Sequence, residues 1–265
     1  MKKIINLILT IFLLFNLFAC QNNTVNDINK DLLNQIKDKS KITVAMEGTW
    51  APWTYHDEND KLVGFDTEVA KAIADKLGVE VSYVEGEWDG LFAGLDGGRY
   101  DVVVNGVEVT EERQEKYDFS EPYAYIKTAL IVRDDNDNIH SFEDLNGKTT
   151  ANSINSTYMN LAESYGANVQ GVDSLDETLE MVLSGRVDAT LNAEVSFYDY
   201  MKVHADAPLK VVALTKDASN VSIPMRKGVY SESLKQEIDN AISELRAEGK
   251  LRAISIKYFN KDITS

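Results

Sequence analysis

Apolar and polar residues alternate along the first half of the chain in a pattern that predicts three strands and two helices. The strands are expected at 41–46, 79–84 and 100–104, and the helices at 66–77 and 88–95. In the first helix, apolar residues recur every fourth position, which places them on one face. The third strand is mostly apolar, as is typical of a strand that is buried on both faces of a parallel sheet.

The same order of elements returns in the second half of the chain. The pattern predicts strands and helices in the same succession at 148–152, 158–165, 169–172, 175–183 and 187–191. Part of the repeat is literal, because Gly-Arg-Tyr-Asp at 98–101 corresponds to Gly-Arg-Val-Asp at 185–188, and Asn105 and Asn192 follow the two motifs at the same distance. A chance likeness would explain the short motif, but the matched order of five elements favours two similar lobes.

Two extended stretches connect the predicted lobes. We expect the first crossing at 127–132 and the return at 219–225. Lobe one is then formed by 41–126 and 226–265, and lobe two by 133–218. Two crossings make a hinge, and a hinge permits the lobes to close on a ligand.

The start of the chain has the pattern of an export signal at residues 1–19. Two lysines precede an apolar run that is too short for a comfortable membrane span, although a single anchoring helix is the alternative. Leu-Phe-Ala-Cys at 17–20 resembles the bacterial lipobox, which implies cleavage before Cys20 and lipid attachment to its sulfur. Residues 20–40 are expected to be the lipidated cysteine and a polar tether, helical from Asp31. We therefore expect an extracytoplasmic protein, in a periplasm or on the outer face of the cell membrane, anchored by its lipid.

The charge balance argues against nucleic acid as a partner. The 265-residue chain has 43 acidic and 27 basic residues, and its net charge of −16 would repel a phosphate backbone. Its single Cys excludes an intrachain disulfide and a cysteine-based zinc cluster. His56, His140 and His204 lie in separate predicted loops without metal-ligand spacing. The sequence also lacks glycine-rich phosphate-binding loops and the nucleophile-elbow motif, so we expect no metal, no cofactor and no catalytic residue.

The predicted binding site lies at the carboxyl ends of the strands, where parallel α/β sheets bind ligands. That rule selects three loops in each half, which begin at Glu47, Glu87, Asn105, Ser153, Asp173 and Asn192. Two lobes that present such loops to each other form a cleft between them.

Charged and aromatic residues near this cleft suit a small ionised ligand. Arg113 follows the third strand, and its planar fork suits a carboxylate. Glu108, at the end of that strand, is suited to an ammonium group. For both residues the alternative is a solvated surface charge. Trp50 and Trp88 lie in or next to cleft loops as aromatic walls, with core packing as the alternative, which is favoured for Trp53.

A polar loop precedes the first helix of lobe two. Ser153, Ser156 and Thr157 offer hydroxyl groups and helix N-terminal N–H groups to an anion. N-capping by Ser156 or Thr157 is an alternative that is compatible with this role.

Eight segments, taken in order, resemble the extracellular solute-binding proteins of polar amino-acid ABC transporters. Two of the eight are pairs, Ala-Pro-Trp at 51–53 with Lys-Leu-Val-Gly-Phe-Asp at 61–66 and Tyr-Asp-Phe-Ser at 117–120 with Pro-Tyr at 122–123, and the others are Thr-Glu-Glu-Arg at 110–113 and the segments at 88–91, 100–103, 144–148, 185–189 and 226–228. The resemblance covers residues 41–261. It implies an α/β fold of two βαβ-based lobes, the type II periplasmic-binding-protein or venus-flytrap fold. It also implies a free amino acid as ligand, ABC permease subunits in the membrane as partners, and a monomer without enzymatic activity.

The resemblance further implies a set of ligand-binding positions. It assigns the ligand carboxylate to Arg113. The other positions that it implies are Glu47, Trp50, Trp88, Asn105, Gly106, Ser156 and Thr157.

Two positions depart from the family pattern. Glu108 stands where the family usually has a small hydroxyl residue, and Ala193 stands where the family has the acid that holds the ligand ammonium. We hypothesise that Glu108 replaces this acid from the opposite lobe, with Glu194 as the competing candidate.

The segments at 87–95 and 188–192 look most like the cystine- and cysteine-binding branch, although another amino acid would also fit the family. Two other functions remain open. One is an enzyme that resembles dehydratases of ring-containing acids, with Glu108 or Glu194 as general acid. The other is a ligand-sensing module, which would need a membrane helix and a signalling domain.

Overall fold

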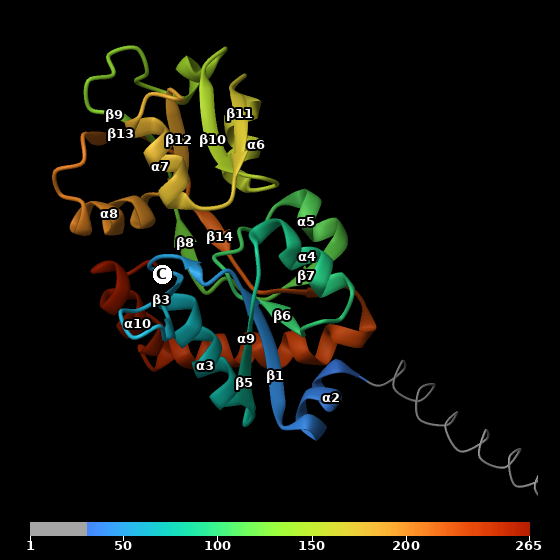
Figure 1. Ribbon diagram of the computed structural model, residues 1–265. Coiled ribbons are helices and arrows are strands. Elements are labelled where there is room, and N and C mark those ends of the chain that lie inside the picture. Colours follow the sequence, from blue (N-terminus) through green and yellow to red (C-terminus); the bar gives the residue numbers. More distant parts are fainter. Residues whose placement is uncertain (1–30) are drawn as a thin grey trace, which may run out of the picture.

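The computed structural model describes residues 31–265, which form two α/β lobes joined by a pair of strands (Figure 1). The predicted export signal and Cys20 lie outside the described residues. Within 31–265, no helix combines the length and the apolar character that crossing a membrane requires.

Lobe one contains a five-stranded sheet made from both ends of the described chain. Its strands are β1 (Lys41–Met46), β5 (Glu80–Glu85), β6 (Val102–Val103), β7 (Tyr117–Phe119) and β15 (Pro224–Arg226). Their order in the sheet is β5–β1–β6–β15–β7. β1 is parallel to β5 and β6, whereas β15 pairs antiparallel with β6 and β7. The returning chain therefore completes the first sheet.

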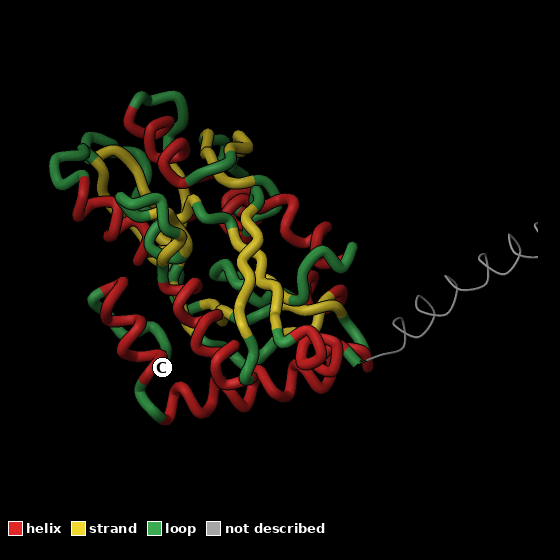
Figure 2. The backbone as a smooth tube through the Cα atoms, turned by 60° about the horizontal axis from the view of Figure 1, so that its bottom comes forward, coloured by secondary structure: helices red, strands yellow, loops and turns green. Residues whose placement is uncertain are grey.

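Helices cover this sheet, as the tube view shows (Figure 2). They are α2 (Leu32–Lys39), α3 (Phe65–Leu77), α4 (Trp88–Asp96), α5 (Glu111–Lys116), α9 (Val229–Ala247) and α10 (Lys250–Phe259). A small sheet follows β1 and consists of β2 (Thr49–Trp50), β3 (Thr54–His56) and β4 (Leu62–Val63). The helices predicted at 66–77 and 88–95 are confirmed as α3 and α4.

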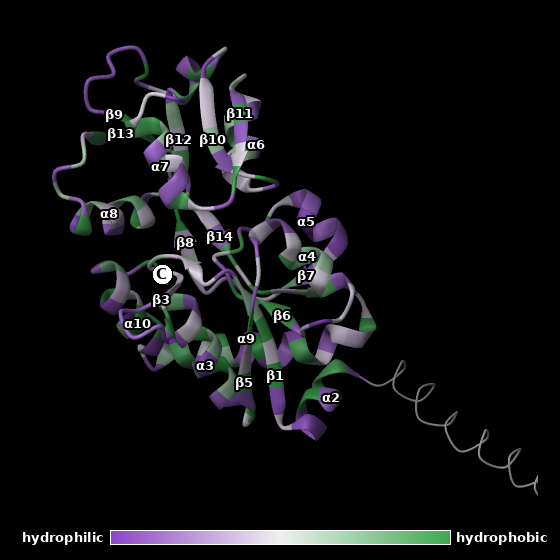
Figure 3. Cartoon of the chain, viewed as in Figure 1, coloured by the Kyte–Doolittle hydropathy of each residue, from purple (hydrophilic) through white to green (hydrophobic). Residues whose placement is uncertain are grey.

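Lobe two repeats the arrangement with a second five-stranded sheet. Its strands are β9 (Thr128–Arg133), β10 (Thr149–Ser153), β11 (Asn168–Val172), β12 (Ala189–Ala193) and β13 (Leu209–Leu214), in the order β11–β10–β12–β9–β13. Its helices are the short 3-10 helix η1 (Phe142–Leu145), α6 (Thr157–Ser164), α7 (Leu175–Leu183) and α8 (Glu194–Val203). Apolar strands lie inside and polar residues lie on the outer faces of the helices in both lobes (Figure 3).

The repeated Gly-Arg-x-Asp motif has the same structural role in both lobes. The carboxylate of Asp101 accepts a hydrogen bond from Thr43 N–H at 2.7 Å, and Asp101 N–H donates to Thr43 O at 2.9 Å. In lobe two, the Asp188 carboxylate accepts from Thr149 N–H at 2.8 Å, and Asp188 N–H donates to Thr149 O at 2.9 Å. Each Asp thus fixes the start of the third strand against the first strand of its lobe. This shared tie accounts for the literal part of the sequence repeat.

The first crossing between the lobes lies before its expected position, whereas the return lies at the start of the expected stretch 219–225. Strands β8 (Ala124–Ile126) and β14 (Ser219–Val221) pair antiparallel and run between the two sheets (Figure 1). Most of the stretch expected as the first crossing, 127–132, is β9, which pairs with β12 and β13 inside lobe two. An apolar extended run predicts a strand, but it does not say which sheet the strand joins.

The segment expected as the end of the polar tether is part of lobe one. The helix expected from Asp31 is present as α2, which Asp31 caps by accepting from Asn34 N–H at 3.1 Å. Leu32 and Ile36 are buried in the core, and Gln35 donates to Tyr230 Oη of α9 at 2.9 Å. Because its apolar face is packed, α2 belongs to the folded lobe rather than to a free tether.

Candidate functional site

A cavity of about 490 Å³ lies between the lobes, and loops at the carboxyl ends of both sheets line it. Eleven of the twelve residues predicted to bind ligand lie in its wall: Glu47, Trp50, Trp88, Asn105, Gly106, Glu108, Arg113, Ser153, Ser156, Thr157 and Asn192. The cavity wall also includes four residues that were not predicted, Thr49, Tyr158, Ser174 and Leu175.

Arg113 is held in place by aromatic rings and backbone carbonyl groups. Its guanidinium carbon lies 5.2 Å from the ring centre of Trp88 and 5.3 Å from that of Phe92. Nη1 donates to the backbone oxygen of Glu108 at 2.9 Å, and Nη2 donates to that of Asn155 in lobe two at 3.4 Å. Burial lowers the pKa of Arg113 because it disfavours the cation. A carboxylate ligand would stabilise this desolvated cation.

Glu108 lies beside this arginine, and its side chain is 5% exposed. Its carboxylate accepts a hydrogen bond from Thr157 Oγ1 across the cleft. None of the ion pairs among residues 31–265 includes Glu108. Ser156 caps α6 by accepting from Met159 N–H at 3.0 Å, so the capping role is confirmed for a residue that also faces the cavity.

Glu47 occupies a second acidic position in the cavity. Its N–H donates to Asn105 Oδ1 at 2.8 Å, and Asn105 Nδ2 donates to its carboxylate at 2.5 Å. Burial raises the pKa of Glu47 to about 7, which the Asn105 hydrogen bond partly opposes. Asn105 lies just after β6 and Glu47 lies just after the neighbouring strand β1, so Asn105 is close enough to orient the carboxylate of Glu47.

The tryptophans divide between the cavity wall and the core. Trp50 faces the cavity and stacks on Trp53 with ring centres 5.2 Å apart. Trp53 is fully buried, which confirms its predicted core position. Its Nε1 donates to Ser196 Oγ of α8 at 2.9 Å, so it also connects the two lobes.

Glu194 is the one predicted residue that the structure places away from the cavity. Its carboxylate forms an ion pair with Lys261, which follows α10 in lobe one. Sequence proximity to Asn192 does not bring it into the wall, because Glu194 begins α8 and its side chain points elsewhere. Glu194 contributes to the contact between the lobes and not to the lining.

Ser174 and Leu175, two of the lining residues that were not predicted, directly follow Asp173, where the sequence predicted that a cleft loop begins. Ser174 caps α7 by accepting from Glu177 N–H at 3.3 Å, and Leu175 is its first residue. The rule that ligands bind at the carboxyl ends of parallel strands predicted this loop, but it did not predict which of its side chains line the cavity. Tyr158 lies inside α6, where helical periodicity alone does not distinguish a core face from a cavity face.

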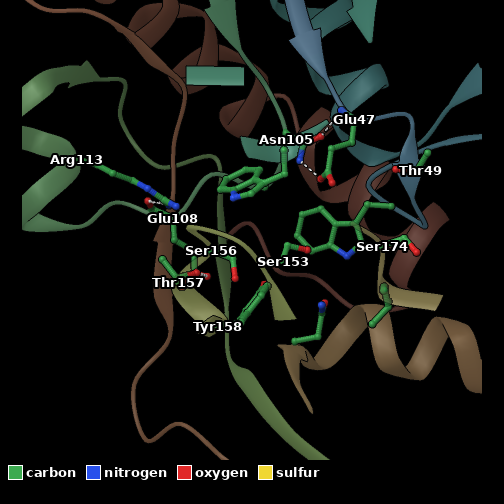
Figure 4. Close-up of a pocket in the computed structure, with 15 residues that line it drawn as sticks. Glu47, Thr49, Asn105, Glu108, Arg113, Ser153, Ser156, Thr157, Tyr158 and Ser174 are labelled. Atoms are coloured by element: carbon green, nitrogen blue, oxygen red, sulfur yellow. Dashed lines mark hydrogen bonds between the residues drawn. The ribbon is translucent and has the colours of Figure 1, made fainter. Parts of the chain in front are cut away.

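The cavity has two polar ends (Figure 4). Arg113, Glu108 and Thr157 gather on one side, whereas Glu47, Thr49 and Ser174 lie on the other. Each end thus has a carboxylate together with hydroxyl donors. Residues 31–265 contain no group of three or more potential metal ligands.

Comparison with known proteins identifies similar chains. Residues 42–261 match the bacterial extracellular solute-binding proteins, family 3. The chain is 37% identical over 270 residues to the L-cystine-binding protein TcyA of Bacillus subtilis, and the match covers 100% of both chains. The unliganded, open L-cystine solute receptor of Neisseria gonorrhoeae is 39% identical, with a TM-score of 0.61 over 88% of this chain and 99% of that chain.

An ancestral arginine-binding protein bound to arginine is 37% identical, with a TM-score of 0.77 over 83% of this chain and 98% of that chain. It superposes better than the open receptor does, which agrees with the hydrogen bonds that connect the lobes here. These comparisons confirm the predicted family and the two-lobed fold.

Proposed function

The chain belongs to the bacterial extracellular solute-binding proteins of family 3, and we propose that it captures L-cystine between its lobes for delivery to an ABC transporter permease. The observation that carries the ligand assignment is the two-ended cavity. Cystine has an ammonium and a carboxylate at each end and a disulfide between them. The cavity has a carboxylate at each end, Glu108 and Glu47, and none of the ion pairs among residues 31–265 includes either of them.

In this proposal the first end of the ligand binds beside Arg113. The guanidinium holds the carboxylate, and Glu108 holds the ammonium, since it is the acid next to Arg113. The hydroxyls of Ser156 and Thr157, with the backbone of Asn105 and Gly106, complete the contacts at this end. Removing one partner of a buried, hydrogen-bonded charge pair typically costs about 2–5 kcal/mol of affinity, because the other charge is left unpaired.

The second end of the ligand lies between lobe one and the start of α7. Glu47, oriented by Asn105, receives the second ammonium, and Thr49, Ser153, Ser174 and Asn192 supply polar contacts. Trp50 and Trp88 enclose the disulfide, because aromatic walls suit a polarisable group and exclude water.

Ligand binding favours the closed form because only that form makes contacts from both lobes. The ligand would first bind lobe one, which supplies Arg113, Glu108 and both tryptophans. Closure then adds the hydroxyls of α6 and the hydrogen bond between Trp53 and Ser196. The closed protein would be recognised by the permease.

The remaining features of the proposal follow from the family and the sequence. We infer a protein without catalytic activity, since the similar chains are named as binding proteins. We further infer export, lipid attachment at Cys20, and action as a monomer. Mass spectrometry of the membrane fraction tests the lipid, because an unmodified Cys20 or an intact signal would contradict the inference.

A thermal-shift screen tests the ligand assignment. Protein lacking residues 1–20 is unfolded and refolded to remove carried ligand, and is then heated with each common amino acid and with cystine. A ligand at about 100 times its Kd stabilises the folded form by roughly 2.7 kcal/mol, which is readily detected. A shift with cystine that is lost in Arg113→Ala supports the proposal. A shift with arginine alone would keep the family function and replace the ligand, and no shift with any amino acid would contradict both.

A further inference from the structure

Asp66 is a fully buried carboxylate that does not line the cavity. It is the second residue of α3 and belongs to the Gly-Phe-Asp segment that begins this helix. None of the ion pairs among the described residues includes it. Burying a charge without a cation is costly unless strong hydrogen bonds stabilise it, so the partners of this carboxylate are informative.

One oxygen of Asp66 holds the loop that follows β6. Oδ2 accepts from Gly106 N–H at 2.5 Å. Gly106 has a φ of +55°, and a Cβ atom here would lie 2.5 Å from the ring of Trp50. The adjacent Asn105 makes both hydrogen bonds that orient Glu47. The carboxylate of Asp66 therefore sits directly behind the part of lobe one that presents backbone and side-chain groups to the ligand.

The other oxygen of Asp66 reaches the strands that cross between the lobes. Oδ1 accepts from Tyr123 Oη at 2.8 Å, and Tyr123 is fully buried. Tyr123 directly precedes β8, and its N–H donates to Val221 O of β14 at 2.9 Å. Asp66 is thus bonded both to the ligand loop and to the residue where the chain leaves lobe one.

The start of α3 also fixes the aromatic wall. Asp66 N–H donates to Trp53 O at 3.0 Å, and Trp53 stacks on Trp50. Two elements of the cavity wall, the tryptophan loop and the loop after β6, therefore meet the start of the crossing strand at one residue. Burial raises the pKa of Asp66 to about 7, while the two hydrogen bonds favour its charged form.

We infer that Asp66 is a positioning residue for ligand binding, which holds the Asn105–Gly106 loop in register with the interlobe strands before the ligand arrives. The inference rests on the proposed function, in that it takes the cavity as the ligand site. A preformed site avoids the cost of ordering its loop on binding, so loss of either Asp66 hydrogen bond weakens binding without removing a ligand contact.

A matched control separates positioning from general stability. Tyr83 Oη donates to Thr67 O, also on α3, at 2.8 Å. This hydrogen bond, like that of Tyr123, joins a tyrosine to the start of α3. Tyr83 does not line the cavity. Tyr83→Phe and Tyr123→Phe therefore remove the same hydroxyl group from two tyrosines bonded to the start of α3, of which only Tyr123 is bonded to Asp66.

The experiment compares Asp66→Asn, Tyr123→Phe and Tyr83→Phe with the parent protein. Titration calorimetry measures the Kd for L-cystine, and thermal unfolding measures stability. Loss of one buried hydrogen bond typically corresponds to roughly 5- to 10-fold in an equilibrium constant, so we expect Kd to rise by about that factor in Tyr123→Phe and by more in Asp66→Asn. Tyr83→Phe should lower the Tm and leave the Kd within about twofold of the parent value.

Amide hydrogen exchange of the ligand-free protein provides a second readout. We expect Gly106 N–H to exchange faster in Asp66→Asn and Tyr123→Phe, and at the parental rate in Tyr83→Phe. Parental Kd and parental exchange in the two test variants would overturn the inference, whatever their Tm. If the parent protein does not bind cystine, the ligand assignment fails, and the exchange rate of Gly106 alone decides the positioning role. If Asp66→Asn does not fold, Tyr123→Phe decides it.

Discussion

Replacing Glu108 by Gln is expected to abolish most of the ligand affinity. In the proposed complex, Glu108 holds the ligand ammonium next to the carboxylate on Arg113. Gln keeps the size of the side chain and an oxygen that can accept from Thr157, so the change removes mainly the charge. The effect then measures the electrostatic part of ammonium binding.

The environment of Glu108 sets the expected magnitude. Glu108 is 5% exposed, and its carboxylate forms no ion pair with a described residue, although the Arg113 guanidinium lies nearby, so the ligand ammonium would be the cation in direct contact with it. Two unit charges about 4 Å apart attract by about 4 kcal/mol at an effective dielectric constant of about 20. Because desolvation and residual hydrogen bonding offset part of this, we expect a loss of about 2–4 kcal/mol, which is a Kd increase of roughly 30- to 700-fold.

Glu194→Gln is the matched control for this prediction. Glu194 is also an almost fully buried acid, but its partner is Lys261 and it does not line the cavity. Its replacement removes an ion pair between the lobes but no ligand contact, so the Kd should rise by at most about tenfold, through weaker closure, and by less than in Glu108→Gln. Calorimetric titration of both refolded variants with L-cystine makes the comparison. If Glu108→Gln binds like the parent protein while Glu194→Gln does not bind, the ammonium assignment is wrong.

Three further predictions concern pH, a glycine and the contact between the lobes. Burial raises the pKa of Glu47 to about 7 in the ligand-free protein, and a ligand ammonium favours the charged form. The affinity for cystine should therefore rise with pH up to about 7, and below pH 7 it should fall by up to about tenfold per pH unit. If Glu47→Gln has the same pH profile as the parent protein, this prediction is wrong. Gly106→Ala adds a methyl at positive φ against an indole ring and should cost about 2–4 kcal/mol in urea unfolding, more than Gly78→Ala, which has positive φ but open space. Ser196→Ala removes the hydroxyl that accepts the hydrogen bond from the indole N–H of Trp53, and it should weaken cystine binding by about tenfold. Small-angle X-ray scattering should then show a more open protein. An unchanged Kd and an unchanged scattering profile would show that this contact does not favour closure.

Much of the fold could be predicted because its signals are local. The alternation of β1 and the apolar face of α3 depend on neighbouring residues, and both elements were predicted within two residues. The repeated motif at Asp101 and Asp188 indicated two similar lobes because its residues and spacing recur, although the hydrogen bonds that it forms join residues 58 and 39 positions apart. The first crossing was misplaced because β9 is an extended apolar strand whichever sheet it joins.

The lining of the cavity was largely predictable from one topological rule. Loops at the carboxyl ends of parallel strands lie at one edge of each sheet, so the loops that begin at Asn105 and Asn192 were expected to line one cleft. The rule acts on loops and not on side chains. It therefore selected the loop at Asp173 and missed Ser174, and it could not exclude Glu194.

The sequence by itself determined the succession of strands and helices, the two similar lobes, the family and most of the loops that face the cleft. These features depend on periodicity, motifs and strand direction, which are properties of short segments. Only the tertiary structure decided that Glu108 faces the cavity while Glu194 pairs with Lys261, and that Asp66 joins the ligand loop to the crossing strands. Each of these contacts connects residues more than 35 positions apart, and the direction of a side chain at such a distance is set by how whole elements pack.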